Sequence, residues 1–149
     1  MSYRSQFTTR EWETLQFAPL WVFSLIAQAD QKIERREIEA LAKELAEAPL
    51  YKSELAQEVF MSIGLSLEAV WPAYQRDSRS VLDGLLETRQ IVEAKLDSDE
   101  ANKFKGALLT LGAEIIKAIS KGPFGTTKDR SKEKAALVLA AITLGFAPG

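Results

Sequence analysis

The sequence predicts an all-α fold, a single-domain helical bundle of about seven to eight helices. Apolar residues recur at the three- and four-residue spacing of an amphipathic helix over most of the 149 residues. No segment alternates polar and β-branched residues as a strand would. With 46% hydrophobic residues the chain can build one core. We therefore expect one domain over residues 1–149, with its core in roughly residues 10–146.

Capping residues and prolines divide the first third of the chain. The first helix begins at Thr8 or Thr9, and Pro19 either begins or kinks the second. Asp30 ends that helix or caps the next one, which stops before Pro49.

The middle of the chain contains three further predicted helices. Ser53 begins the first of them, and Gly64 ends it as a left-handed cap. Ser66 begins a short helix, and Ser78 opens another that runs to about Lys95.

The last two predicted helices differ in their hydrophobic pattern. Asp97 or Ser98 caps a long helix that ends at Gly122. It carries an apolar stripe at Leu108, Leu111, Gly112, Ile115, Ile116 and Ile119. Ser131 caps the last helix, and residues 134–145 are apolar nearly all round. We expect this last helix to lie in the middle of the bundle.

Residues 19–46 and 107–145 resemble each other, because both run from an apolar helix through a polar turn to a capped helix with a Glu-x-x-x-Leu spacing. This weak internal repeat predicts two helix pairs about a pseudo-twofold axis, each covering the apolar face of the other.

Composition excludes several kinds of chemistry. The chain has no cysteine and no histidine, so thiolate nucleophiles, imidazole bases and the usual zinc, copper and haem ligands are absent. No other catalytic constellation is present, and we expect a non-enzymatic protein. The most apolar run, residues 18–29, is 12 residues long, too short to span a bilayer. We expect a cytoplasmic location.

Charge is distributed unevenly along the chain. Residues 11–68 carry 11 acidic against 5 basic side chains, whereas residues 101–149 carry 3 acidic against 8 basic ones. The whole chain is slightly acidic, and its aromatic residues are not interleaved with basic ones, so we expect no nucleic-acid partner.

The turn at Asp30 has two interpretations. Asp30, Glu34 and Glu37 are hard oxygen ligands, and with backbone carbonyls and water they could hold one calcium, magnesium or manganese ion. An EF-hand is excluded, because Ile26 and Gln28 stand where its first and third ligands belong. In the other interpretation Asp30 only caps a helix, and the glutamates complement its dipole.

A second cluster is basic. Lys121, Lys128, Arg130 and Lys132 lie in and beside a glycine-containing connector before the last helix. They could form a surface for an acidic partner or another anion, or they could be a solvated loop. The spacing does not match a P-loop.

The segment AQADQKIERREIEAL, residues 27–41, resembles the signature of the tellurite-resistance TerB-like family. The two segments LLTLGAEIIKAISKGPFG and SKEKAALVLAAITLG, residues 108–125 and 131–145, resemble its C-terminal helix pair. The resemblance implies a bundle of about seven helices, a role in bacterial tellurite and chemical-stress resistance, and divalent-metal binding or protein interaction near membrane partners. A homodimer is one form that such interaction could take.

Two residues depart from the pattern of that family. Gln31 stands where a glycine is usual, and Ser120 stands where the second copy would have its aspartate. If metal binding is the ancestral property, we expect one site in this chain instead of two.

Overall fold

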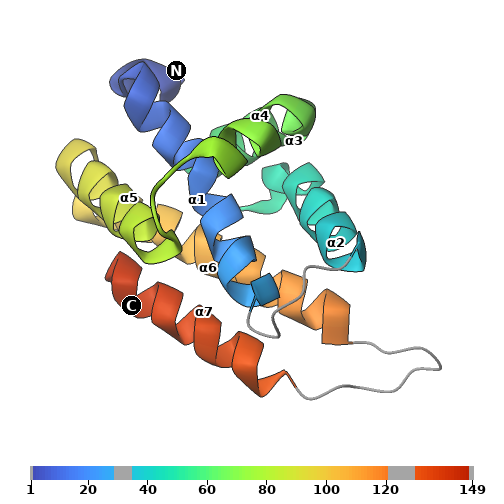
Figure 1. Ribbon diagram of the computed structural model, residues 1–149. Coiled ribbons are helices and arrows are strands. Elements are labelled where there is room, and N and C mark those ends of the chain that lie inside the picture. Colours follow the sequence, from blue (N-terminus) through green and yellow to red (C-terminus); the bar gives the residue numbers. More distant parts are fainter. Residues whose placement is uncertain (1, 29–34, 121–129, 148–149) are drawn as a thin grey trace.

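The computed structural model describes residues 2–28, 35–120 and 130–147, and this part of the chain is helical without a strand (Figure 1). The all-α prediction is therefore confirmed. The elements in chain order are η1 (Arg4–Gln6), α1 (Thr9–Ala27), α2 (Arg35–Ala46), η3 (Ala48–Leu50), α3 (Glu54–Leu65), α4 (Leu67–Arg76), α5 (Val81–Lys95), α6 (Ser98–Ser120) and α7 (Ser131–Leu144).

Most helices begin where a side chain caps the free backbone N–H groups. The Thr8 hydroxyl accepts from the N–H of Glu11, whose carboxylate accepts from the N–H of Thr8, a complete capping box. The hydroxyl of Ser53 caps α3 and that of Ser80 caps α5, each by accepting from one backbone N–H, so the cap of α5 lies two residues after the predicted Ser78.

Two predicted helix ends are wrong. Helix α1 continues through Pro19, so the residues on both sides of the proline form one helix and not two. Burial of this helix in the core outweighs the backbone hydrogen bond that a proline removes. Gly64 lies inside α3 and does not have the positive φ of a left-handed cap; within the described residues only Gly145 does.

Helix α1 passes through the middle of the bundle, with α5 and α7 on one side and α2 on the other (Figure 1). It packs against α5, α6 and α7, while α2 packs on α6. Each predicted helix pair thus covers part of the other, as the weak repeat predicts. All six residues of the predicted apolar stripe of α6, which runs from Leu108 to Ile119, are buried.

The α4–α5 connection is attached to α1 by Arg79. Its guanidinium donates to both carboxylate oxygens of Asp77, to Glu87 and to the hydroxyl of Thr14. It also lies 4.9 Å from the ring centre of Trp21. Arg79 therefore links the α4–α5 connection to α5, through Glu87, and to α1, through Thr14 and Trp21.

The prediction that the last helix lies in the middle of the bundle is wrong. Only Glu133, Ala140 and Leu144 of α7 are buried. Large apolar side chains on its outer face are exposed, at Val138, Leu139 and Ile142. An apolar surface all round a helix therefore does not mean here that the helix is surrounded by its own chain.

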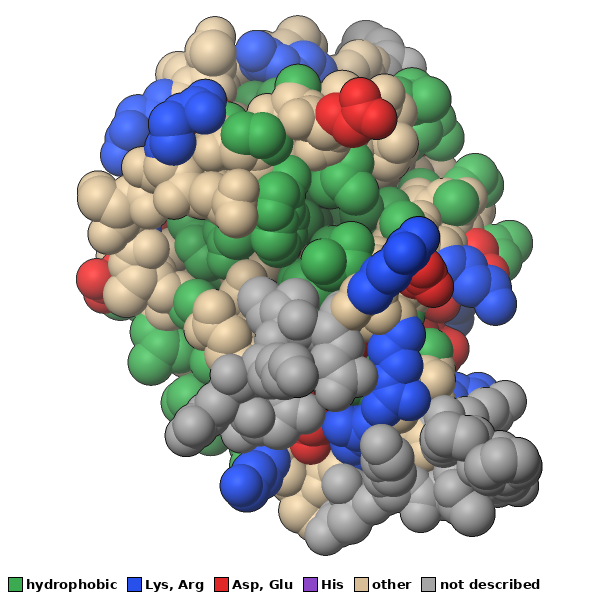
Figure 2. Space-filling model, turned by 45° about the vertical axis from the view of Figure 1, so that its right-hand side comes forward, with side chains coloured by type: hydrophobic (Ala, Val, Ile, Leu, Met, Phe, Trp, Pro, Cys, Tyr) green, Lys and Arg blue, Asp and Glu red, His purple; other side chains and the backbone are tan. Residues whose placement is uncertain are grey.

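Hydrophobic side chains also gather near the centre of the face shown in Figure 2, with Lys and Arg side chains at its borders. None of the described helices is long and apolar enough to cross a membrane.

Candidate functional site

The predicted acidic turn lies only partly within the described residues. Asp30 and Glu34 fall outside them, whereas Glu37 lies in the first turn of α2 and is only 3% exposed. Among residues 2–28, 35–120 and 130–147, no group of three acidic side chains could hold a metal ion. The metal site that includes Asp30 and Glu34 stays a prediction.

The predicted basic surface is also divided. Lys121 and Lys128 lie outside the described residues, and Lys132 is exposed on α7. Arg130 differs from the prediction, because its side chain is only 8% exposed. Its guanidinium pairs with Glu133 at 3.0 Å and donates to the carbonyl of Ile119 at 2.6 Å, so it joins the end of α6 to the start of α7.

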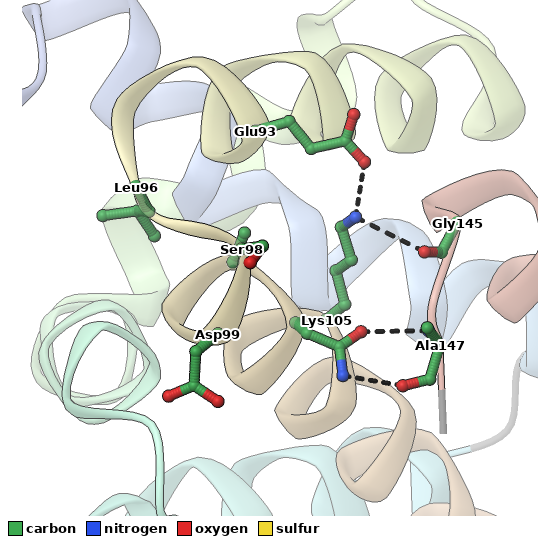
Figure 3. A pocket seen from close by; sticks show the side chains of 9 residues that line it. Glu93, Leu96, Ser98, Asp99, Lys105, Gly145 and Ala147 are labelled. Atoms are coloured by element: carbon green, nitrogen blue, oxygen red, sulfur yellow. Dashed lines mark hydrogen bonds and ion pairs between the residues drawn. The ribbon is translucent and has the colours of Figure 1, made fainter. Parts of the chain in front are cut away.

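A pocket of about 520 Å³ lies beside the first turns of α6 (Figure 3). The Nζ of Lys105, a buried side chain, lies 2.6 Å from a carboxylate oxygen of Glu93 and 3.4 Å from the carbonyl oxygen of Gly145. The Lys105 ammonium holds the pKa of Glu93 below its usual range. Through these contacts Lys105 supports the segment that follows α7.

Asn102, one turn before Lys105 in α6, holds the same segment. Its side-chain amide donates to the carbonyl of Ala147 at 2.8 Å, and its carbonyl oxygen accepts from the N–H of Ala147 at 2.9 Å (Figure 3). Between these anchors Phe146 lies over Gly106, where an added Cβ would be 3.0 Å from the ring. The segment is thereby fixed with the Phe146 ring against α6.

The ring of Phe146 forms one wall of a groove along α6. Two adjoining depressions of about 470 and 280 Å³ share Leu50, Tyr51 and Thr110. The first reaches Phe146 and is bordered by Lys52 and Lys103, and the second reaches the carboxylates of Glu44, Glu47 and Glu114. We call this feature the α6 groove, with an apolar end at Phe146 and an acidic end at the three glutamates.

Glu44 is the most buried acid of the groove. It accepts a 2.9 Å hydrogen bond from the hydroxyl of Tyr51. Burial raises the pKa of Glu44, and the negative charges of Glu47 and Glu114 raise it further. Burial and the bond to Glu44 also raise the pKa of the Tyr51 hydroxyl. The acidic end therefore concentrates negative charge in a partly enclosed place.

Within the described residues, none of Glu44, Glu47 and Glu114 is paired with a lysine or arginine of this chain, although sixteen other acidic and basic side chains form ion pairs. The arrangement suits binding: it offers an apolar surface for one group and carboxylates for a cationic one.

Comparison with known proteins gives one relative of similar length. A protein of Methanothermobacter thermautotrophicus, described as "Uncharacterized protein ORF11'", is 30% identical over 118 residues, which cover 77% of this chain and 78% of the relative. The chain belongs to the ORF11' family. No protein-family model matches it, and no solved structure matches it significantly.

The match to the ORF11' protein extends well beyond a short motif. Because it covers 77% of the chain, it includes helices α2 to α5 wherever it begins. The stretch from α2 to α5 contains Glu44, Glu47, Leu50 and Tyr51 of the α6 groove. The printed description of the relative names no substrate, ligand or partner.

Sequence reasoning did not find the α6 groove in this member of the ORF11' family, although one signal was present. Glu37, Leu41 and Glu44 follow the three- and four-residue spacing of one helix face, and all three are buried. Glutamates on the core face of a helix are uncommon and mark a place where carboxylates have a special environment. Thr110 and Phe146 form the opposite wall of the α6 groove. They are distant in sequence from Glu44, and only the fold brings them beside it.

Proposed function

We propose that this chain is a non-enzymatic, TerB-like module that acts by binding protein, and that it assembles with a second copy through the outer face of α7. The observation that carries the proposal is the exposed apolar face of this helix. Ile142 is 69% exposed, and Val138 and Leu139 lie one turn before it. Exposed apolar patches of this kind mark interaction surfaces.

A second copy fits this face because the face is uncharged. Between Lys134 and Gly145, helix α7 contains no acidic or basic residue. A twofold axis places the same patch on both sides of an interface, so a charged patch would meet its own charge and an apolar one would not. Helix α5, which packs against α7, adds exposed Leu82 and Leu86.

Molecular mass as a function of concentration tests the assembly. Light scattering after gel filtration, over about a hundredfold range of concentration, should show a monomer converting to a dimer. Ile142→Asp should remain a monomer throughout, because a buried charge without a partner opposes association. Leu65→Asp is the matched control: Leu65 is 86% exposed, but on α3, so this variant should dimerise like the parent. A monomeric parent, or equal masses for both variants, would contradict the proposal.

The resemblance to the TerB-like family supplies the remainder of the proposal. It supports a role in tellurite and chemical-stress resistance, a cytoplasmic location, and partners that include membrane-associated proteins. The seven α-helices of the described residues agree with the bundle that the resemblance implies. The acidic turn is the wrong sign for the tellurite anion, so a resistance role would be indirect.

A metal-linked module is the second candidate function, and buried Glu37 favours it. Glu37 lies in the first turn of α2, three residues after Glu34, and its side chain is withdrawn from water. Withdrawing a carboxylate from water is unfavourable unless cations or hydrogen-bond donors compensate for it. One divalent cation at the turn would be one such compensation.

Calorimetric titration and thermal melting of the chelator-stripped protein test this candidate. Calcium, magnesium or manganese should bind near one equivalent and stabilise the protein, by about 2.7 kcal/mol when the free metal is about 100 times Kd. Glu37→Gln should abolish the heat and the stabilisation. Glu39→Gln, an exposed glutamate of the same helix, should leave both intact. Equal responses in the two variants, or no response to any of the metals, would remove the candidate.

A further inference from the structure

The α6 groove combines two surfaces that single globular proteins normally keep covered or paired. At its apolar end Leu50 is 79% exposed and faces the same depression as Phe146. At its acidic end Glu44, Glu47 and Glu114 converge on the second depression. Since both depressions share Tyr51 and Thr110, one ligand can occupy them together.

Several specific contacts keep this groove formed. The two hydrogen bonds between Asn102 and Ala147 and the contact of Lys105 with Gly145 fix the segment that carries Phe146. Gly145 has φ of 68°, and an added Cβ there would lie 2.6 Å from the guanidinium carbon of Arg89. The wall of the groove is therefore held in place by the fold and is preorganised for a ligand.

The charge of the groove selects the ligand. At the acidic end, three carboxylates that lack basic partners within the described part of the chain attract a cation, whereas Lys52 and Lys103 line the other depression. The three carboxylates do not have an arrangement that could hold a metal ion. A guanidinium or ammonium group remains, and the guanidinium is the better match because it donates to two carboxylates at once.

We infer that the α6 groove binds a segment of a partner protein that presents an arginine or lysine beside a large apolar side chain. The cationic group enters the acidic end between Glu47 and Glu114, and the apolar side chain lies on Leu50 and Phe146. The inference is independent of the α7 face and of metal binding. It adds a partner of defined chemistry to the proposed interaction module.

Fluorescence anisotropy with three labelled hexapeptides tests the chemistry. The peptides alternate arginine with leucine, arginine with serine, and glutamate with leucine. The arginine–leucine peptide should bind at least about tenfold more tightly than the arginine–serine peptide, and the glutamate–leucine peptide should not bind. Equal binding of both arginine peptides would show charge attraction alone and would overturn the inference, as would the absence of binding.

Matched variants of the full chain locate the binding. Leu50→Ala and Glu114→Gln should each weaken the arginine–leucine peptide by about tenfold, and Thr110→Arg should abolish binding by placing a cation of its own in the groove. Thr110 is exposed, so the last change leaves the core intact. The controls are Leu65→Ala and Glu68→Gln, two exposed positions outside the groove, which should bind like the parent.

Two results would reassign the groove. If the control variants weaken the peptide as much as the groove variants, the peptide binds elsewhere. If Leu50→Ala or Thr110→Arg turns a dimeric parent into a monomer, a second copy of this chain occupies the groove. Failure of the α7 proposal has a different signature, because Ile142→Asp would then leave the mass unchanged while peptide binding persists.

Discussion

Replacing Gly84 with alanine will destabilise the fold by about 1–3 kcal/mol, although alanine is the better helix residue. A Cβ added at Gly84 would lie 2.3 Å from the indole of Trp21. This ring cannot move away easily, since it is buried, packs edge-on against Phe17 and lies under the guanidinium of Arg79. The steric conflict therefore outweighs the gain in helix propensity.

Gly64→Ala is the matched control, because Gly64 also lies inside a helix but has room for a side chain. The nearest atom to an added Cβ is Cβ of Leu45, at 3.8 Å, an ordinary contact. We expect this variant to gain up to about 1 kcal/mol from helix propensity. Urea unfolding followed by circular dichroism measures both changes, and a gain in stability at both positions would show that the indole yields without cost.

The contrast between these glycines shows where sequence reasoning stops. Helix propensity treats Gly64 and Gly84 alike, and only the position of Trp21, 63 residues before Gly84, separates them. Features that depend on neighbours in sequence were predicted well: the α6 stripe is buried, and Thr8 and Ser53 cap their helices. These features follow from the helical period and from the first free N–H groups of a helix.

The end of the chain shows the opposite case. Residues 134–145 are apolar nearly all round, which suits a helix surrounded by its own chain and equally suits one covered by another molecule. The pattern cannot distinguish them, because it records apolar surface and not what covers that surface. Helix α7 lies at the surface with Ile142 outward, and the proposed second copy would cover this face.

The candidate site could not be predicted from the sequence for a similar reason. Its two walls meet through contacts between distant residues, such as Asn102 with Ala147, and no local pattern predicts such a pair. The buried position of Glu44 in α2 could have been read from the helical spacing, yet its neighbours Tyr51 and Glu114 could not. The predicted acidic turn at Asp30 was a local pattern, and it stays a prediction.

Replacing Arg79 with methionine will cost about 2 kcal/mol of stability, between the values for an exposed and for a fully buried ion pair, because the pair with Asp77 is part-buried. Methionine keeps the length and apolar volume of the side chain but none of its charge or donors. The variant leaves the carboxylate of Asp77, only 15% exposed, without the guanidinium that lies 2.8 Å away. It also removes the donor to Thr14 Oγ1 and the cation above Trp21.

The matched control for this change is Arg35→Met. Arg35 pairs with Glu39 at 3.2 Å, but its side chain is 92% exposed. Solvent screens that pair, so the loss should stay within about 0.5 kcal/mol. Thermal or urea unfolding of the two variants compares the same chemical change in a buried and an exposed place. A similar loss in both would mean that the Arg79 network contributes no more than a surface pair.

The dependence of this loss on pH, compared with and without the Asp77 carboxylate, measures the share that comes from the charge on Asp77. The guanidinium of Arg79 holds the pKa of Asp77 in the folded protein below its usual range, so the folded state binds fewer protons there than the unfolded chain. This contribution to stability is complete above the unfolded pKa of about 3.9 and is lost as the pH falls through the lower folded value. The difference in stability between the parent and Arg79→Met should therefore shrink as the pH is lowered below about 4, and it should shrink less in an Asp77→Asn background, which keeps only the pair with Glu87. A difference that stays constant over this range would assign the loss to packing on Trp21 instead of to the ion pair.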